Sequence, residues 1–181
     1  MKRTMMVLGF LGVSAASASA QAPTTLSGDL AKTIGEVETK LTGLGQAMNA
    51  AQYDWRPGAG VRSVGEVLLH VAADNYFLPV MLGVAAPAAT KITGEYPTVQ
   101  AYEQQKLSRE ATLAEVTASF AHLKAALAGV PESRMNETIR VFGQEFTVRG
   151  FLVLTATHLH EHLGQMIAYA RSNGVTPPWS R

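Results

Sequence analysis

Apolar and polar residues alternate with the period of an α-helix in four long stretches of this chain. Between residues 26 and 48, apolar side chains recur every three or four positions, a pattern typical of an amphipathic helix. A second helix is predicted to begin at Ser63, because Ser63 and Glu66 have the spacing of an N-terminal capping box. It runs to about Gly83, and Pro79 is expected to kink its last turn.

The second half of the chain repeats the helical pattern twice. Residues 98–127 are predicted to form one long third helix, in which apolar residues again recur among polar neighbours. The fourth helix is predicted to start at Thr147 or a near neighbour. It ends near Asn173 and Gly174, since glycine is a natural helix stop.

Two connections between these helices have patterns of their own. Residues 85–97 are expected to form a loop between the second and third helices. Before the fourth helix, residues 138–142 and 145–148 flank Gly143 and Gln144 and could pair as a small hairpin. Four long helices with one long connection predict an all-α protein, an up-down four-helix bundle.

The first 20 residues have the order of a secretory signal peptide. Lys2 and Arg3 precede an apolar run over residues 5–13, and small residues then lead to Ala20, after which we expect cleavage. The alternative is an uncleaved N-terminal anchor, although the apolar run is short for a membrane span. We therefore expect a periplasmic or secreted protein, not stably inserted in the membrane after cleavage, in which residues 21–181 form one domain.

Charge and cysteine content narrow the functions that the chain can have. The formal net charge of the 181 residues is +1, and it becomes −1 if Lys2 and Arg3 are removed. No concentrated basic face is visible, so nucleic acid is not expected as a partner. The chain has no cysteine, which excludes disulfides, thiolate ligands and a cysteine nucleophile. Any metal must therefore be held by nitrogen and oxygen.

Three of the five histidines lie together in the predicted fourth helix. His158 and His162 are one turn apart and share a face, with Gln165 a further turn on, whereas His160 points the other way. Such a pair can bind one divalent metal, and His70 in the second helix is the best candidate for a third ligand. Imidazole suits several divalent metals, of which zinc and nickel are the first candidates. The alternative is a pH-sensitive polar cluster at one end of the bundle.

Two carboxylates near these histidines are candidate catalytic groups. Asp74 follows His70 by one turn, and Glu161 lies to one side of the histidine pair. Either could orient a bound water or hold a ligand histidine through its second nitrogen, and the alternative for both is a solvated surface carboxylate. The spacing is not His-Glu-x-x-His, which disfavours a metalloprotease. Three further residues could line a pocket or, alternatively, support the fold: Trp55, Arg56 and Tyr76.

Four short motifs follow one another along the chain. They are Asp54-Trp55-Arg56-Pro57, Arg62-Ser63-Val64-Gly65-Glu66-Val67 ahead of His70, His158-x3-His162-x2-Gln165, and Gly174-Val175-Thr176-Pro177-Pro178-Trp179-Ser180. In their order and spacing the chain resembles the DinB/YfiT superfamily of bacterial four-helix bundles, over nearly all of residues 21–181. Matched position by position, the resemblance implies a metal triad of His70, His158 and His162.

The resemblance implies more than one activity. Some relatives resemble metal-dependent hydrolases, and others are S-transferases that use thiols such as mycothiol or bacillithiol. The thiol-using relatives are cytoplasmic, and the predicted signal peptide departs from that pattern. As an enzyme, the protein would act on a small-molecule substrate such as an ester or amide. The alternatives are a non-catalytic metal-binding protein of the cell envelope and an interaction module. Related bundles often form dimers, so a homodimer is a further expectation.

Overall fold

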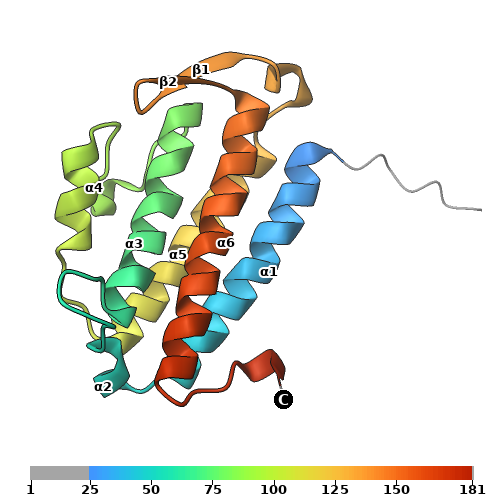
Figure 1. The fold of residues 1–181 in the computed structure, drawn as a ribbon. Coiled ribbons are helices and arrows are strands. Elements are labelled where there is room, and N and C mark those ends of the chain that lie inside the picture. The colour runs from blue at the N-terminus through green and yellow to red at the C-terminus, as the bar shows by residue number, and fades with distance from the viewer. Residues whose placement is uncertain (1–24, 181) are drawn as a thin grey trace, which may run out of the picture.

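Four long helices form the body of the protein in a computed structural model that describes residues 25–180 (Figure 1). The expected signal peptide, residues 1–20, lies outside this range. The four helices pack against one another, which confirms the predicted four-helix bundle. Their bounds are α1 (Leu26–Ala47), α3 (Val64–Phe77), α5 (Arg109–Ala128) and α6 (Val148–Ser172).

Side-chain caps determine where these helices begin. The Ser63 hydroxyl accepts a hydrogen bond from the Glu66 backbone N–H, and the Glu66 carboxylate accepts one from the Ser63 N–H, which completes the predicted capping box. Thr147 likewise caps α6 through the Gly150 N–H, so the predicted start of the fourth helix is confirmed.

The end of α3 shows the effect of proline. The α-helix ends at Phe77, and a 3-10 helix continues over Leu78–Leu82, with Pro79 in its first turn. Gly83 then ends the segment with a φ of 90°, a left-handed conformation that glycine adopts readily. The helical segment thus stops at the expected residue, but its last part is not α-helical.

The single helix predicted over residues 98–127 is wrong. Two helices, α4 (Tyr96–Glu103) and α5, cover this stretch, and α4 also takes up the end of the expected loop. The break has a local cause, because the Ser108 hydroxyl caps a new helix by accepting from the Ala111 N–H. The Arg109 guanidinium then donates to two backbone carbonyls at the end of α1, those of Gln46 and Met48.

The order of helix directions also differs from a simple up-down bundle. In Figure 1, α3 and α5 both start at the end of the bundle near α2 (Ala50–Tyr53) and run parallel. The cause is the long connection with α4, which leads the chain back along the bundle before α5 begins. As a result, α1 packs against α5 and α6, and α3 packs against the same two helices.

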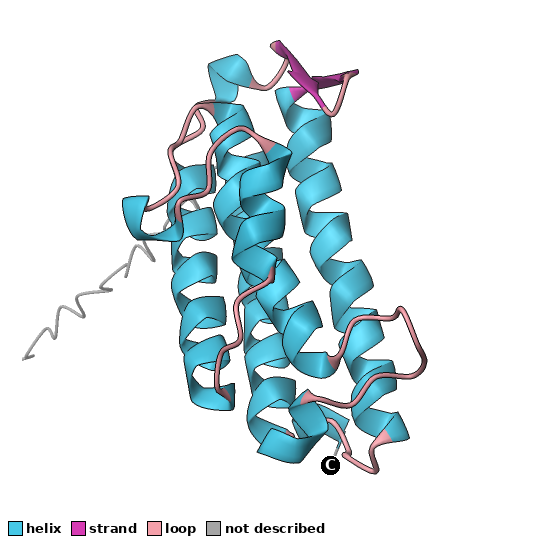
Figure 2. Cartoon of the chain, turned by 90° about the vertical axis from the view of Figure 1, so that its left-hand side faces the viewer, coloured by secondary structure: helices cyan, strands magenta, loops and turns pink. Residues whose placement is uncertain are grey.

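The expected hairpin is present at one end of the bundle, as Figure 2 shows. Strands β1 (Thr138–Val141) and β2 (Gln144–Thr147) are antiparallel, and Val141 pairs with Gln144 across a two-residue turn. The turn consists of Phe142 and Gly143, one position earlier than the sequence pattern predicted. Three short 3-10 helices complete the described chain: Ala88–Thr90, Glu132–Arg134 and Pro178–Ser180.

Helix α3 is the most enclosed element of the bundle. Every residue from Val67 to Phe77 is buried, polar side chains included, because α4, α5 and α6 all pack on this helix. His70 and Asp74 are therefore held inside the fold. None of the helices in the described chain is long and apolar enough to cross a membrane.

Candidate metal centre

Four side chains with metal-binding groups meet between α3 and α6. His70 and Asp74 come from α3, and His158 and His162 come from α6. One potential ligand atom from each residue lies within 4.8 Å of all the others. Each pair is one turn apart, so each helix presents two side chains to the same point. The structure therefore brings the three predicted histidines together and adds Asp74 to them.

The Nε2 atoms of His70 and His158 face the Asp74 carboxylate. Asp74 Oδ2 lies 3.2 Å from His70 Nε2 and 2.7 Å from His158 Nε2. His162 Nε2 is buried and has no hydrogen-bond partner among the described residues. The His162 ring lies 4.7 Å from the His70 ring and 4.5 Å from the His158 ring, between centroids. A buried imidazole nitrogen without a partner is costly, and a metal ion bound here would satisfy it.

The outer nitrogens of two histidines are held by hydrogen bonds. His70 Nδ1 lies 2.7 Å from Glu103 Oε1, and His162 Nδ1 lies 3.0 Å from Gln165 Oε1. Because a carboxylate and an amide oxygen can only accept, each Nδ1 donates its proton. That tautomer leaves the lone pair on Nε2, toward the centre of the cluster, as a metal ligand requires.

Glu103 is the residue at this site that sequence reasoning missed. Its second carboxylate oxygen, Oε2, accepts from the Arg62 guanidinium at 2.9 Å. Burial opposes ionisation of Glu103, but the hydrogen bonds from His70 and Arg62 outweigh it and lower the pKa of this carboxyl. No spacing signal could have found Glu103, because it reaches His70 from α4, a helix that the sequence pattern did not separate from α5.

The two α6 histidines have opposite electrostatic environments. The hydrogen bond to Asp74 raises the pKa of His158 above its usual value. Burial lowers the pKa of His162, which favours the neutral ring. His160, between them in sequence, is exposed on the other side of α6, where its Nδ1 lies 2.8 Å from the Ala156 carbonyl oxygen. The predicted division of faces is thus observed.

Glu161 lies at the edge of the cluster. Its Oε2 is 3.7 Å from His158 Nδ1, and its side chain is 76% exposed. That position differs from Asp74, which is buried and touches two of the histidines. Catalytic roles for Asp74 and Glu161 stay predictions.

Three residues considered for the pocket lie elsewhere. The Trp55 ring packs edge-on against Tyr169, with centroids 5.3 Å apart. Arg56 forms an ion pair with Glu66 at 3.1 Å. The hydroxyl of the third residue, Tyr76, faces a carboxylate of α5. These contacts favour the alternative role of fold support for all three.

A cavity of about 380 Å³ opens on the cluster. Its lining combines ligand candidates with apolar side chains, and these residues come from α3, the 3-10 helix after α3, α4, the hairpin turn and α6. The lining comprises His70, Asp74, Leu78, Tyr96, Phe142, Leu154, Thr155 and His158. Structural metal sites are closed by their ligands, whereas catalytic sites keep an open side next to a cleft. The cluster has such an open side next to a cavity.

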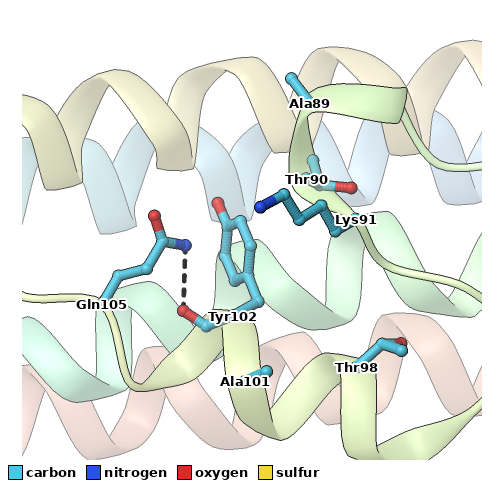
Figure 3. A pocket seen from close by; sticks show the side chains of 7 residues that line it. All are labelled: Ala89, Thr90, Lys91, Thr98, Ala101, Tyr102 and Gln105. Carbon is cyan, nitrogen blue, oxygen red and sulfur yellow. Dashed lines mark hydrogen bonds between the residues drawn. The ribbon is translucent and has the colours of Figure 1, made fainter.

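Another cavity, of about 400 Å³, lies beside α4 (Figure 3). Lys91, Thr98, Tyr102 and Gln105 contribute to its lining, and the Gln105 side chain donates to the Tyr102 carbonyl oxygen. None of the four cluster residues lines this cavity. The cavity at the histidines is therefore the candidate substrate site.

Comparison with known proteins identifies a matching family and solved structures with a similar fold. The family model of the DinB superfamily matches residues 34–166. A DinB-like protein of Bacillus subtilis has a TM-score of 0.63 and 17% identity, over 82% of this chain and 93% of that chain. YfiT of Bacillus subtilis is described as a probable metal-dependent hydrolase with an unusual four-helix bundle topology. Its TM-score is 0.62 and its identity 15%, over 92% of this chain and 95% of that one.

A conserved protein of Enterococcus faecalis has a TM-score of 0.68 and 16% identity, over 82% of this chain and 97% of that chain. At such identities the likeness to these solved structures establishes the fold alone. No curated protein matches the sequence.

Proposed function

The chain belongs to the DinB superfamily, and from this membership and the geometry of the cluster we propose that it is a metal-dependent hydrolase of small esters or amides. His70, His158 and His162 would hold one divalent ion, with zinc and nickel as the first candidates. The observation that carries the proposal is the cavity of about 380 Å³ beside two of these histidines and Asp74. The description of YfiT as a probable metal-dependent hydrolase agrees with it.

The residues present fit a bound metal. His162 Nε2, which is buried and has no hydrogen-bond partner within residues 25–180, would be one ligand, and hydrogen bonds to Glu103 and Gln165 fix the rings of His70 and His162. When bound, the metal would activate water and polarise a substrate carbonyl.

The carboxylates have separate roles in this proposal. Asp74 lines the cavity and would accept the proton of the attacking water, since its carboxylate is buried next to His70 and His158. Glu161 would help to orient His158 from the solvent side, through Nδ1. We further propose that the protein acts in the periplasm or outside the cell, after removal of residues 1–20.

Metal content is the first test. The protein would be purified without chelator or histidine tag and measured by mass spectrometry, together with His70→Ala, His158→Ala and His162→Ala. We expect about one metal ion per chain in the unaltered protein and a loss in each variant. His160→Ala is the matched control, because His160 lies on the same helix but faces away, and this variant should keep its metal.

Hydrolysis would then be measured with p-nitrophenyl esters and anilides. Turnover that falls with metal content supports the hydrolase. A protein that neither contains metal nor binds added zinc or nickel contradicts the whole proposal. Metal binding without turnover of any of these substrates would leave a non-catalytic metal-binding protein.

A further inference from the structure

We propose that the cavity at the cluster is a subsite for an apolar group of the substrate, and that Phe142 at the hairpin tip determines this specificity. The inference rests on the proposed function, since it names the substrate class of the same site: uncharged esters or amides with an alkyl or aryl substituent on the reacting carbonyl.

The backbone of Phe142 is the first observation. Phe142 and Gly143 have φ values of 53° and 77°, so both turn residues are left-handed. Two-residue hairpin turns with this geometry favour Asn-Gly, because asparagine tolerates positive φ better than most residues with a side chain. A bulky aromatic residue at the first position is strained. The hairpin would form more easily with another residue there.

The side chain of Phe142 is the second observation. It is 60% exposed, so it contributes little to the core. Its ring lies 6.0 Å from that of Phe77, between centroids, and it lines the cavity. Phe142 thus combines a strained backbone with an exposed apolar surface, and the position of its ring at the cavity accounts for both.

Phe142 has two partners from other elements. Tyr96, at the start of α4, is 49% exposed, and Leu154 of α6 is 38% exposed. Both line the same cavity as Phe142. Three exposed hydrophobic side chains from a hairpin, a short helix and a bundle helix therefore border one opening. Convergence from separate elements is what a binding site requires and what scattered surface residues lack.

The cavity also has polar lining groups. They are His70, Asp74 and His158, together with Thr155, whose hydroxyl already donates to the Phe151 carbonyl oxygen. Among residues 25–180, no lysine or arginine lines this cavity. A carboxylate or phosphate on the substituent would therefore find no lysine or arginine to pair with, whereas each methylene that enters should tighten binding about fourfold. The substrate is therefore oriented with its carbonyl at the cluster and its apolar group under Phe142.

The test uses Phe142→Asn, which suits the turn but removes the ring. Binding of a series from acetamide to hexanamide to the zinc-loaded protein would be measured by ligand-observed NMR. In the unaltered protein the dissociation constant should fall at least twofold per added methylene. In the variant the dissociation constant should not change with chain length. The melting temperature should stay the same or rise, and the zinc content should be unchanged. Val153→Asn, next to Leu154 but outside the lining, is the control and should behave like the unaltered protein.

The outcomes separate this inference from the proposed hydrolase. Chain-length-dependent binding without any ester hydrolysis would support the subsite and contradict the hydrolase. If esters are hydrolysed but all amides of the series bind equally well, the subsite alone is overturned. The same holds if Phe142→Asn leaves the dependence of amide binding on chain length unchanged. If Phe142→Asn converts a dimer to a monomer in light scattering and leaves amide binding unaltered, the ring serves a contact between copies, and the subsite is likewise overturned.

Discussion

The Glu103 carboxylate lies 2.7 Å from Nδ1 of His70, and it links a short peripheral helix to the most buried helix of the bundle. The same carboxylate accepts from Arg62. A carboxylate behind a ligand histidine fixes the ring and raises its basicity, and loss of such a partner typically costs 10- to 100-fold in metal affinity.

Glu103→Gln should therefore weaken zinc binding by about 10- to 100-fold, because the amide keeps the shape of the side chain but loses the charge. Competition with a chromophoric chelator would measure the dissociation constant. Glu36→Gln, at an exposed position of α1, is the control and should not change it. Equal affinities in all three proteins would show that Glu103 plays no part in metal binding.

Removal of metal should destabilise the fold, because an ion that binds only the native state adds stability by mass action. At a free zinc concentration of 100 times the dissociation constant the gain is about 2.7 kcal/mol, or very roughly 5–10 °C in melting temperature for a domain of this size. Calorimetry with zinc and with a chelator would show the difference. His162→Ala should abolish it, and His160→Ala should retain it. A melting temperature that does not respond to zinc in the unaltered protein would contradict the site.

Asp74→Asn should lower kcat by about 10²- to 10⁴-fold if Asp74 is the proton acceptor, because the amide cannot take up a proton. Metal content, measured on the same sample, distinguishes a proton acceptor from a metal ligand. Retained metal with lost turnover is the expected result. Loss of both together would identify Asp74 as a fourth ligand instead, a role that its contacts with His70 and His158 also permit.

The capping box of α3 should give a pH-dependent contribution to stability. The Ser63 backbone N–H is the largest cause that lowers the pKa of Glu66, with the Arg56 ion pair as a further one. A lowered native pKa means that the carboxylate stabilises the fold above its unfolded pKa of about 4.3, and that this contribution disappears as pH falls through the native value.

Glu66→Ala should therefore reduce the free energy of unfolding by about 0.5–1 kcal/mol at pH 7, given the exposure of the side chain. The gap to the unaltered protein should narrow when urea denaturation is repeated toward pH 3. Glu36→Ala is a suitable comparison, because it removes an exposed glutamate from α1 without removing a cap. A gap of the same size at both pH values would argue against the carboxylate as its source.

The parts of this protein that follow local rules could be predicted from its sequence. The hydroxyls of Ser63 and Thr147 cap the helices that begin after them, and the shared face of His158 and His162 depends only on helix geometry. Asp74 near His70 follows from the same spacing. These features need no knowledge of how the helices pack.

The remaining parts depend on contacts between distant segments. The apolar spacing continues through the break before Ser108, so the division into α4 and α5 was not visible in it. Helices α3 and α5 run parallel because of the path that the long connection between them takes. The spacing of apolar residues does not reveal this path. Glu103 and Phe142 reach the site only through that folding, from α4 and the hairpin tip.

Helix α4 begins with Tyr96 and ends with Glu103. Tyr96 lines the cavity, and Glu103 holds the outer nitrogen of His70. The two residues are two turns apart on one short helix, and so on roughly the same face. One short helix therefore places both a wall of the cavity and the hydrogen-bond partner of His70, so any shift of α4 would move the two together.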